Sequence, residues 1–254
     1  MRPKAGHSSG TSGNKIYYNL RGKKDNERKA FFDVVEASDS GGYEVVETTT
    51  SVKGVFIGLE HSTYETKVNN KPMTKDKIIV YLYNDETHKI MVVSAPMGNM
   101  ARTLMNNMTN LWTSHKNDID FLEISVWTSS KNESINNNLA LRHWNPSIDH
   151  DGEKIGWYFD WEKQSSMITE GQDGFNDYKK LNQFLINMWK KIAVAIDSDP
   201  EVSRYKAMFE QYLEESEEKS SYKDMPDGEI HSKNFEQSKT HTPIGSDDED
   251  DLPF

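Results

Sequence analysis

The chain has 254 residues, no cysteine and a formal net charge of −11. The lack of cysteine excludes disulfides, cysteine-ligated zinc and thiol catalysis, and it fits a reducing cytoplasm. No apolar run reaches the roughly 18 residues that a membrane-spanning helix needs, and residues 1–15 lack the hydrophobic segment of a secretory signal. We therefore expect a cytoplasmic protein of one or two domains that does not enter a membrane.

The charge is unevenly distributed along the chain. Residues 1–165 hold 20 Lys+Arg against 21 Asp+Glu, whereas residues 166–254 hold 10 against 20. Residues 1–30 hold eight basic residues against two acidic ones, and we expect them to form a basic, partly disordered N-terminal arm. A nearly neutral body with a basic start and an acidic end is typical of chains with charged partners.

The body of the chain, from residue 31 to residue 165, shows mainly strand patterns. Alternation of core-facing and outward-facing residues is clearest where Ile78, Val80 and Leu82 interleave with Lys77, Tyr81 and Tyr83. A tight Asn84–Asp85–Glu86 turn makes this strand one arm of a hairpin. Strands are predicted at residues 31–36, 51–60, 77–85, 88–95, 119–127, 139–144 and 154–161.

One helix interrupts the strands. Met100, Leu104, Met108 and Leu111 recur at helical spacing in residues 97–112, after Pro96. The resulting order is a strand, a two-stranded hairpin, a helix and two more strands. It predicts a mainly β protein with an OB-fold, a five-stranded Greek-key barrel, over residues 31–165. A β-sandwich with one additional helix is the alternative.

Beyond residue 165 the pattern becomes helical and then polar. Residues 175–196 carry an apolar helical stripe, and Asp199–Pro200 is a start signal for a second helix. We expect residues 166–213 to form a helical extension of the barrel. Residues 214–254 have no periodicity and are expected to form a disordered acidic tail.

Aromatic and basic residues share the predicted outward faces of several strands. Tyr81 and Tyr83 lie with Lys77, and Trp127 lies opposite a core-facing stripe. Phe56 is flanked by glycines and is expected to present an uncovered ring. Such faces are typical of proteins that bind single-stranded nucleic acid, because bases stack on rings while cations follow the phosphates.

Two polar segments are predicted to be the loops with which an OB-fold clamps a strand. They are residues 62–76, rich in lysine, and residues 129–138. The residues expected to bind DNA are Lys53, Phe56, Tyr64, Lys67, Lys71, Lys77, Tyr81, Tyr83, Trp127, Arg142 and Trp144.

Catalysis finds little support in the sequence. No phosphate-binding glycine loop, nucleophile elbow or cysteine–histidine arrangement is present. Asp149, Asp151 and Glu153 are spaced closely enough to bind a divalent cation, which leaves a metal-dependent enzyme acting on nucleic acid as the alternative. We expect no catalytic residues, no metal and no cofactor.

The chain ends on DDEDDLPF, five acids followed by an apolar tip. This octapeptide resembles the acidic C-terminal tail of bacterial single-stranded DNA-binding proteins, with Leu in place of the more usual Ile. The longer body and the basic arm resemble the phage-encoded type. The residues that match the tail are Asp247, Asp248, Glu249, Asp250, Asp251, Leu252, Pro253 and Phe254.

The resemblance implies a protein that coats single-stranded DNA without sequence preference and protects it. It also implies that the tip recruits proteins of DNA replication, recombination and repair. In the phage-encoded case the protein would act in the host cytoplasm.

Overall fold

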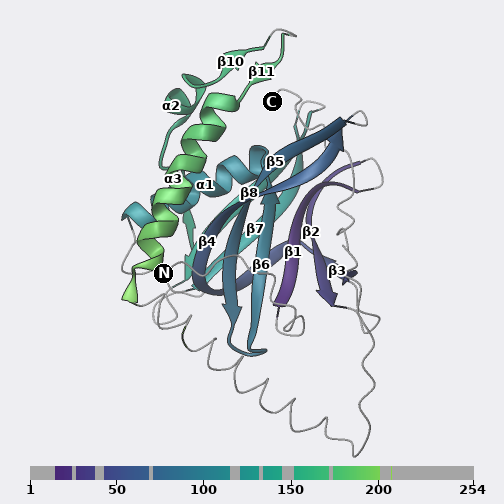
Figure 1. Ribbon diagram of the computed structural model, residues 1–254, viewed down its shortest axis with the longest axis vertical. Helices are drawn as coiled ribbons and strands as arrows, with labels where there is room; N and C mark the ends of the chain where they lie inside the picture. Colours follow the sequence, from purple (N-terminus) through teal and green to yellow (C-terminus); the bar gives the residue numbers. More distant parts are fainter. Residues whose placement is uncertain are drawn as a thin grey trace, which may run out of the picture.

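A computed structural model describes residues 15–24, 27–37, 43–68, 71–114, 121–131, 134–144, 152–171, 174–200 and 207. These residues form a mainly β protein: a large mixed sheet with a few helices on one side of it (Figure 1). Most of the expected second helix and all of the expected tail, including residues 247–254, lie outside the described residues. In the described part of the chain, no helix has both the length and the apolar character to cross a membrane.

The sheet has nine strands in the order β3-β2-β1-β6-β5-β4-β7-β8-β9. Neighbours pair antiparallel except β1 and β6, which pair parallel. A separate two-stranded sheet, β10 with β11, lies near the start of α3. The elements are β1 (Lys15–Lys24), β2 (Glu27–Ala37), β3 (Tyr43–Thr49), β4 (Ser51–Val68), β5 (Lys71–Asn84), β6 (Lys89–Pro96), α1 (Asn99–Ser114), β7 (Phe121–Lys131), β8 (Ser134–Trp144), β9 (Glu153–Ile155), α2 (Trp161–Ser165), β10 (Thr169–Glu170), β11 (Asn176–Asp177) and α3 (Lys179–Asp197).

The predicted order of one strand, a hairpin, a helix and two strands is confirmed for β4, β5, β6, α1, β7 and β8. In the sheet these five strands lie side by side as β6-β5-β4-β7-β8, because β4 pairs with β7 from Ser51 to Val55 and with β5 from Val55 to Val68. The predicted strand at residues 31–36 is also confirmed, as part of β2.

The N-terminal part of the chain differs from the prediction. Residues 15–24, expected in a partly disordered arm, form β1, which lies inside the sheet between β2 and β6. β3 was not predicted either. The parallel partner of β1 is more than 60 residues away, so no hairpin signal marks the pairing.

At the other end of the sheet, the strand expected at 154–161 is short, since β9 covers only Glu153–Ile155 and α2 begins at Trp161.

Both predicted clamp loops are wrong as loops, because the flanking strands continue through them. Residues 62–68 of β4 pair with residues 71–77 of β5, beyond the ends of the neighbouring strands. This two-stranded extension is called the β4–β5 ribbon below. Residues 129–131 likewise pair with 134–136 in the β7–β8 hairpin.

The main core lies on the sheet face that α1 and α3 cover. Ile78, Val80 and Leu82 face it, as predicted, and each is fully buried. Phe56 is only 1% exposed and belongs to the same core, so the expected uncovered ring is wrong. A β-bulge between Phe56 and Gly58 is the reason, because one extra residue reverses the alternation along β4.

The sheet curls so that β2 reaches the β7–β8 hairpin. Two hydrogen bonds join them without a strand ladder: the Ala30 amide donates to Thr128 Oγ1 at 2.8 Å, and Arg28 donates to the Ile135 carbonyl at 2.9 Å. A third reaches β1, because the Asn137 amide side chain donates to the Gly22 carbonyl at 2.9 Å. The N-terminal strands are therefore integral to the curved sheet.

Docking of α3 on β4 depends on Trp189. Its indole is fully buried and donates from Nε1 to the Glu60 carbonyl at 2.9 Å.

We predict that Trp189→Phe lowers the free energy of unfolding by about 1–3 kcal/mol, because a cavity forms and a buried carbonyl loses its donor. Urea unfolding measures the loss. Val194→Ala, at a 59% exposed position of the same helix, is the control and stays within about 0.5 kcal/mol of the parent; equal stability of Trp189→Phe and the parent would contradict this account of α3.

Candidate nucleic-acid interface

The sheet face opposite α1 and α3, called the outer face below, carries a second apolar cluster. Since alternate residues of a strand point to opposite faces, the neighbours of the main-core residues in β5 and β6 gather here. Helix residues contribute to the main core and not to this cluster. Its buried members are Val55, Ile57, Ile79, Tyr83, Ile90 and Val92, with Tyr17, Tyr81 and Phe121 packed against them.

Tyr81 and Tyr17 lie at the same level of the outer face, because both are register partners of Val92 in β6. Tyr81 donates from its hydroxyl to Glu60 Oε2 at 2.5 Å. Burial, followed by this hydrogen bond and the charge of Glu60, raises the pKa of Tyr81. Burial and the neighbouring Tyr43 raise the pKa of Tyr17 to about 12. Both phenols are therefore neutral at working pH and do not repel a phosphate.

The β4–β5 ribbon extends the outer face with a row of lysines. Lys77, Lys75 and Lys71 alternate along β5 in the same parity as Tyr81, and Tyr64 is the register partner of Lys75. Cross-strand partners share a face, so all of these residues lie on the outer side of the ribbon. The hydrogen-bonded Glu60 is the one carboxylate on that side of the paired residues 60–68 and 71–79.

The opposite side of the ribbon has a different charge. Lys67 pairs with Pro72 and therefore lies on this opposite side, together with Glu65 and Asp76. Asp76 Oδ1 lies 2.7 Å from His61 Nε2. The predicted grouping of Lys77 with Tyr81 on one strand face agrees with the register. Of the residues expected in the lysine-rich loop, Lys71 and Tyr64 lie on that same side and Lys67 lies on the other.

Trp127 gives the outer face an open ring at the β7–β8 hairpin. It is 42% exposed, and Lys154 Nζ from β9 lies 5.9 Å from its ring centroid. A cation near an indole face leaves the ring available for stacking on its other side. The alternation of Trp127 with core-facing residues along β7 predicts this outward position.

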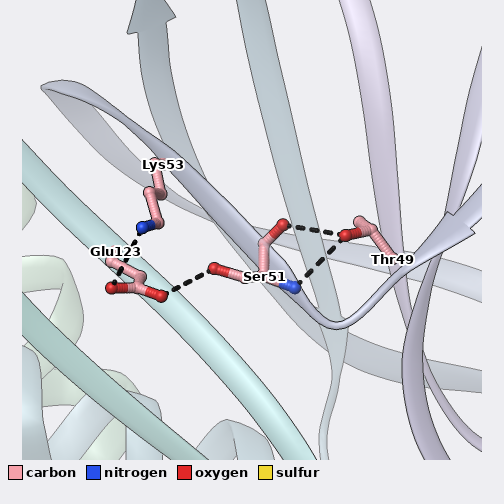
Figure 2. Close-up of polar contacts among 4 residues, drawn as sticks. All are labelled: Thr49, Ser51, Lys53 and Glu123. Carbon is pink, nitrogen blue, oxygen red and sulfur yellow. Dashed lines mark hydrogen bonds and ion pairs between the residues drawn. The ribbon is translucent and has the colours of Figure 1, made fainter.

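A row of charged residues crosses β4, β7, β8 and β9 on the outer face, as the register partners Lys53, Glu123, Arg142 and Lys154. Figure 2 shows how Glu123, only 7% exposed, is held in this row. Ser51 donates from Oγ to Glu123 Oε1 at 2.8 Å, and Lys53 Nζ lies 3.7 Å from Oε2. Since Lys53 is about half exposed, its ion pair is the weaker of the two contacts.

Two other predicted DNA contacts do not reach a solvent-facing surface. Phe56 is a core residue, and Tyr83 is 3% exposed within the outer cluster, so neither ring is open to a base. Trp144 closes β8 opposite Phe121, on the outer face by register, and its side chain lies outside the described part.

The structure adds residues that the sequence analysis missed, namely Tyr17, Tyr43, Glu123 and Lys154. Tyr17 lies in the segment predicted to be a basic arm, although Ile16, Tyr18 and Leu20 alternate with polar or aromatic neighbours. That alternation was the available signal for β1. Glu123 carries no comparable signal, because its burial follows from its contacts with Ser51 and Lys53 in the folded sheet.

The described residues contain no group of three or more metal-ligating side chains. Of the three acids considered for a metal site, Asp149 and Asp151 lie outside the described ranges. The third, Glu153, contacts His143: its Oε2 lies 3.1 Å from His143 Nε2.

Comparison of the chain with protein-family models, with curated proteins and with solved structures found no match.

The Glu123 contacts lead to a stability prediction. Glu123→Ala should lower the free energy of unfolding by about 1–3 kcal/mol, because the Ser51 hydroxyl loses its acceptor and a nearly buried side chain is removed. Glu123→Gln keeps an acceptor for Ser51 and loses only the ion pair with Lys53, so it should cost less than about 1 kcal/mol. Urea unfolding of both variants distinguishes the contacts; equal losses would show that the ion pair, not the hydrogen bond, dominates.

Proposed function

We propose that the chain binds single-stranded DNA without sequence preference, coats and protects it during replication, recombination and repair, and recruits partner proteins through its C-terminal tip. The observation that carries the proposal is the outer face of β5 and its ribbon, where Tyr81 and Tyr64 share one side with Lys71, Lys75 and Lys77. Rings and lysines on one continuous strip match the alternation of bases and phosphates in a single strand.

Local charge favours this use of the face although the whole chain is acidic. Lysines line the outer side of the ribbon, while carboxylates lie mainly on its other side. The electrostatic potential at the outer face depends mainly on nearby charges, because salt screens the interaction between exposed charges that are more than about 10 Å apart. The neutral phenols of Tyr17 and Tyr81 add no repulsion.

The OB-fold is the architecture we propose for the five central strands. Their order, β6-β5-β4-β7-β8 with α1 between β6 and β7, supports this assignment, as does the curl that brings β2 to the β7–β8 hairpin. In OB-folds, the face of the second and third strands and the two adjoining hairpins bind oligonucleotides. In this chain those elements are β5, β6, the β4–β5 ribbon and the β7–β8 hairpin.

The tail is assigned two targets in the proposal. Leu252–Pro253–Phe254 inserts into a basic-rimmed apolar pocket on replication, recombination and repair proteins, and the five acids before it compete with DNA for the protein's own lysines. The tether expected from the sequence of residues 214–246 would give the acids a high effective concentration at the outer face.

The first prediction of the proposal concerns strand choice and the ribbon lysines. The full chain should bind an oligo-dT more tightly than a duplex of equal length, because stacking needs unpaired bases. Replacing Lys71, Lys75 and Lys77 together by Gln should weaken binding and reduce the slope of log affinity against log salt by about 2, since each phosphate contact to a single strand contributes about 0.7. Fluorescence anisotropy over a salt series measures both quantities.

Lys67→Gln is the matched control, because Lys67 projects from the other side of the same ribbon. Its salt slope should equal that of the parent chain. Equal affinity for single strand and duplex would refute the proposed function, and an unchanged slope in the triple variant would refute the assigned face.

A second prediction concerns the tail. Deleting residues 247–254 should abolish recruitment and raise affinity for oligo-dT modestly, most at low salt, where charge competition is least screened. Removing Phe254 alone should abolish recruitment and leave DNA affinity unchanged. Changing the five acids to Asn and Gln should raise DNA affinity as the deletion does. Anisotropy reports DNA affinity, and pull-down of a protein known to bind the tails of bacterial single-stranded DNA-binding proteins reports recruitment.

Two outcomes would contradict the tail assignment. One is a loss of DNA affinity on deletion, which would make the tail part of the binding site. The other is unchanged partner binding by the truncated chain.

A further inference from the structure

The N-terminal strands continue the outer face beyond the five central strands. β1 is joined to β6, β2 to β1 and β3 to β2, so the sheet gains three strands on the side of β6. On these strands Tyr17 of β1 and Tyr43 of β3 meet over the outer face, with ring centroids 5.5 Å apart at an interplanar angle of 87°.

Tyr43 is the open member of this pair. It is 50% exposed, whereas Tyr17 is half-buried and packs against the outer cluster. The edge-to-face contact supports the Tyr43 ring from one side and fixes its orientation. A ring that is held and half exposed can take a base at low entropic cost.

The pair lies in line with Tyr81. Tyr17 and Tyr81 are both register partners of Val92, and one strand, β6, separates their strands. With neighbouring strands about 4.8 Å apart, the two backbones are roughly 10 Å from each other. A single strand that stacks on Tyr81 therefore reaches Tyr17 and Tyr43 by continuing across the sheet.

We propose that Tyr43, supported by Tyr17, is a further base-stacking position that extends the single-stranded DNA site onto β1–β3. The inference rests on the proposed function. It assigns part of the DNA site to strands that stand outside the five-stranded unit and makes the occupied length of DNA longer than that unit alone would give.

The charges around the pair fit a nucleic acid better than a second copy of this chain. Lys15 lies two residues from Tyr17 on the same face of β1. Asp33, the carboxylate on the outer face of β2 nearest to this level, is held by Arg21 at 2.7 Å. Burial, followed by the contact with Tyr43, raises the pKa of Tyr17 to about 12, so the position stays neutral. Antiparallel pairing of two β3 edges would bring Glu44 and Glu47 of both copies together.

A length series of oligo-dT tests the proposal. Affinity should rise with length over roughly 4–20 nucleotides and then reach a plateau. Tyr43→Leu should bind the shortest oligonucleotides like the parent and the plateau lengths roughly 5- to 100-fold more weakly, and its plateau should begin at a shorter length. Tyr43→Phe keeps the ring and should match the parent at every length.

Tyr158→Leu is the matched control. Tyr158 is 44% exposed and makes a similar edge-to-face contact, with Phe159 at 4.8 Å, but it belongs to the segment between β9 and α2. It should leave all affinities unchanged. Thermal melting of each variant verifies that the sheet is intact.

The possible failures are distinguishable. If the parent chain binds no oligo-dT, the proposed function fails. If the parent binds and Tyr43→Leu matches it at every length, only the extended site fails. A loss in Tyr43→Leu that is equal at all lengths, or shared by Tyr43→Phe, also overturns the stacking role.

Discussion

The double pairing of β4 is the constraint on which the rest of the structure depends. This strand pairs with β7 from Ser51 to Val55 and with β5 from Val55 to Val68, and it carries the carbonyl that receives the Trp189 indole. Its register therefore decides which side chains of three strands face the helices and which face outward. A shift by one residue would exchange the two sets, because side chains alternate along a strand.

That register produces the chemistry of the outer face. On β5, the residues that do not face the main core include Ile79, Tyr81 and the ribbon lysines. The strand that contributes to the main core therefore also presents an aromatic and basic strip on its other face. The same rule places Trp127 outward on β7. A site built on paired strands is held more rigidly than one on loops, which favours stacking contacts that need defined ring orientation.

A chain with net charge −11 is an unexpected candidate for binding a polyanion. In this chain the basic and the acidic residues are separated from each other. The ribbon segregates lysines and carboxylates onto opposite sides, and the densest run of acids, residues 247–251, lies at the far end of the chain. In the proposed function these acids act as an internal competitor, so the net charge describes the tail rather than the DNA-binding face.

Alternation was enough to predict the core face of β5 and the outward Tyr81 and Trp127, and apolar residues at helical spacing predicted the helix between the third and fourth strands of the unit. It failed at Phe56, because the bulge at residues 56–58 inserts one residue and no feature of the local sequence except its glycines marks that insertion. It also failed for β1, whose parallel partner is distant in sequence. In the β4–β5 ribbon the composition, dominated by lysine, asparagine and threonine, predicts a loop, and it does not indicate that the two strands continue to pair.

The most direct test of the outer face as the DNA site is acetylation of lysines in the full chain, with and without saturating oligo-dT, quantified by mass spectrometry. The account predicts that Lys71, Lys75 and Lys77 are protected several-fold, while Lys67, on the other side of the same ribbon, and Lys163 in α2 react equally in both samples. Protection of Lys67 equal to that of Lys71, or no protection of the three ribbon lysines when DNA is bound, would contradict it.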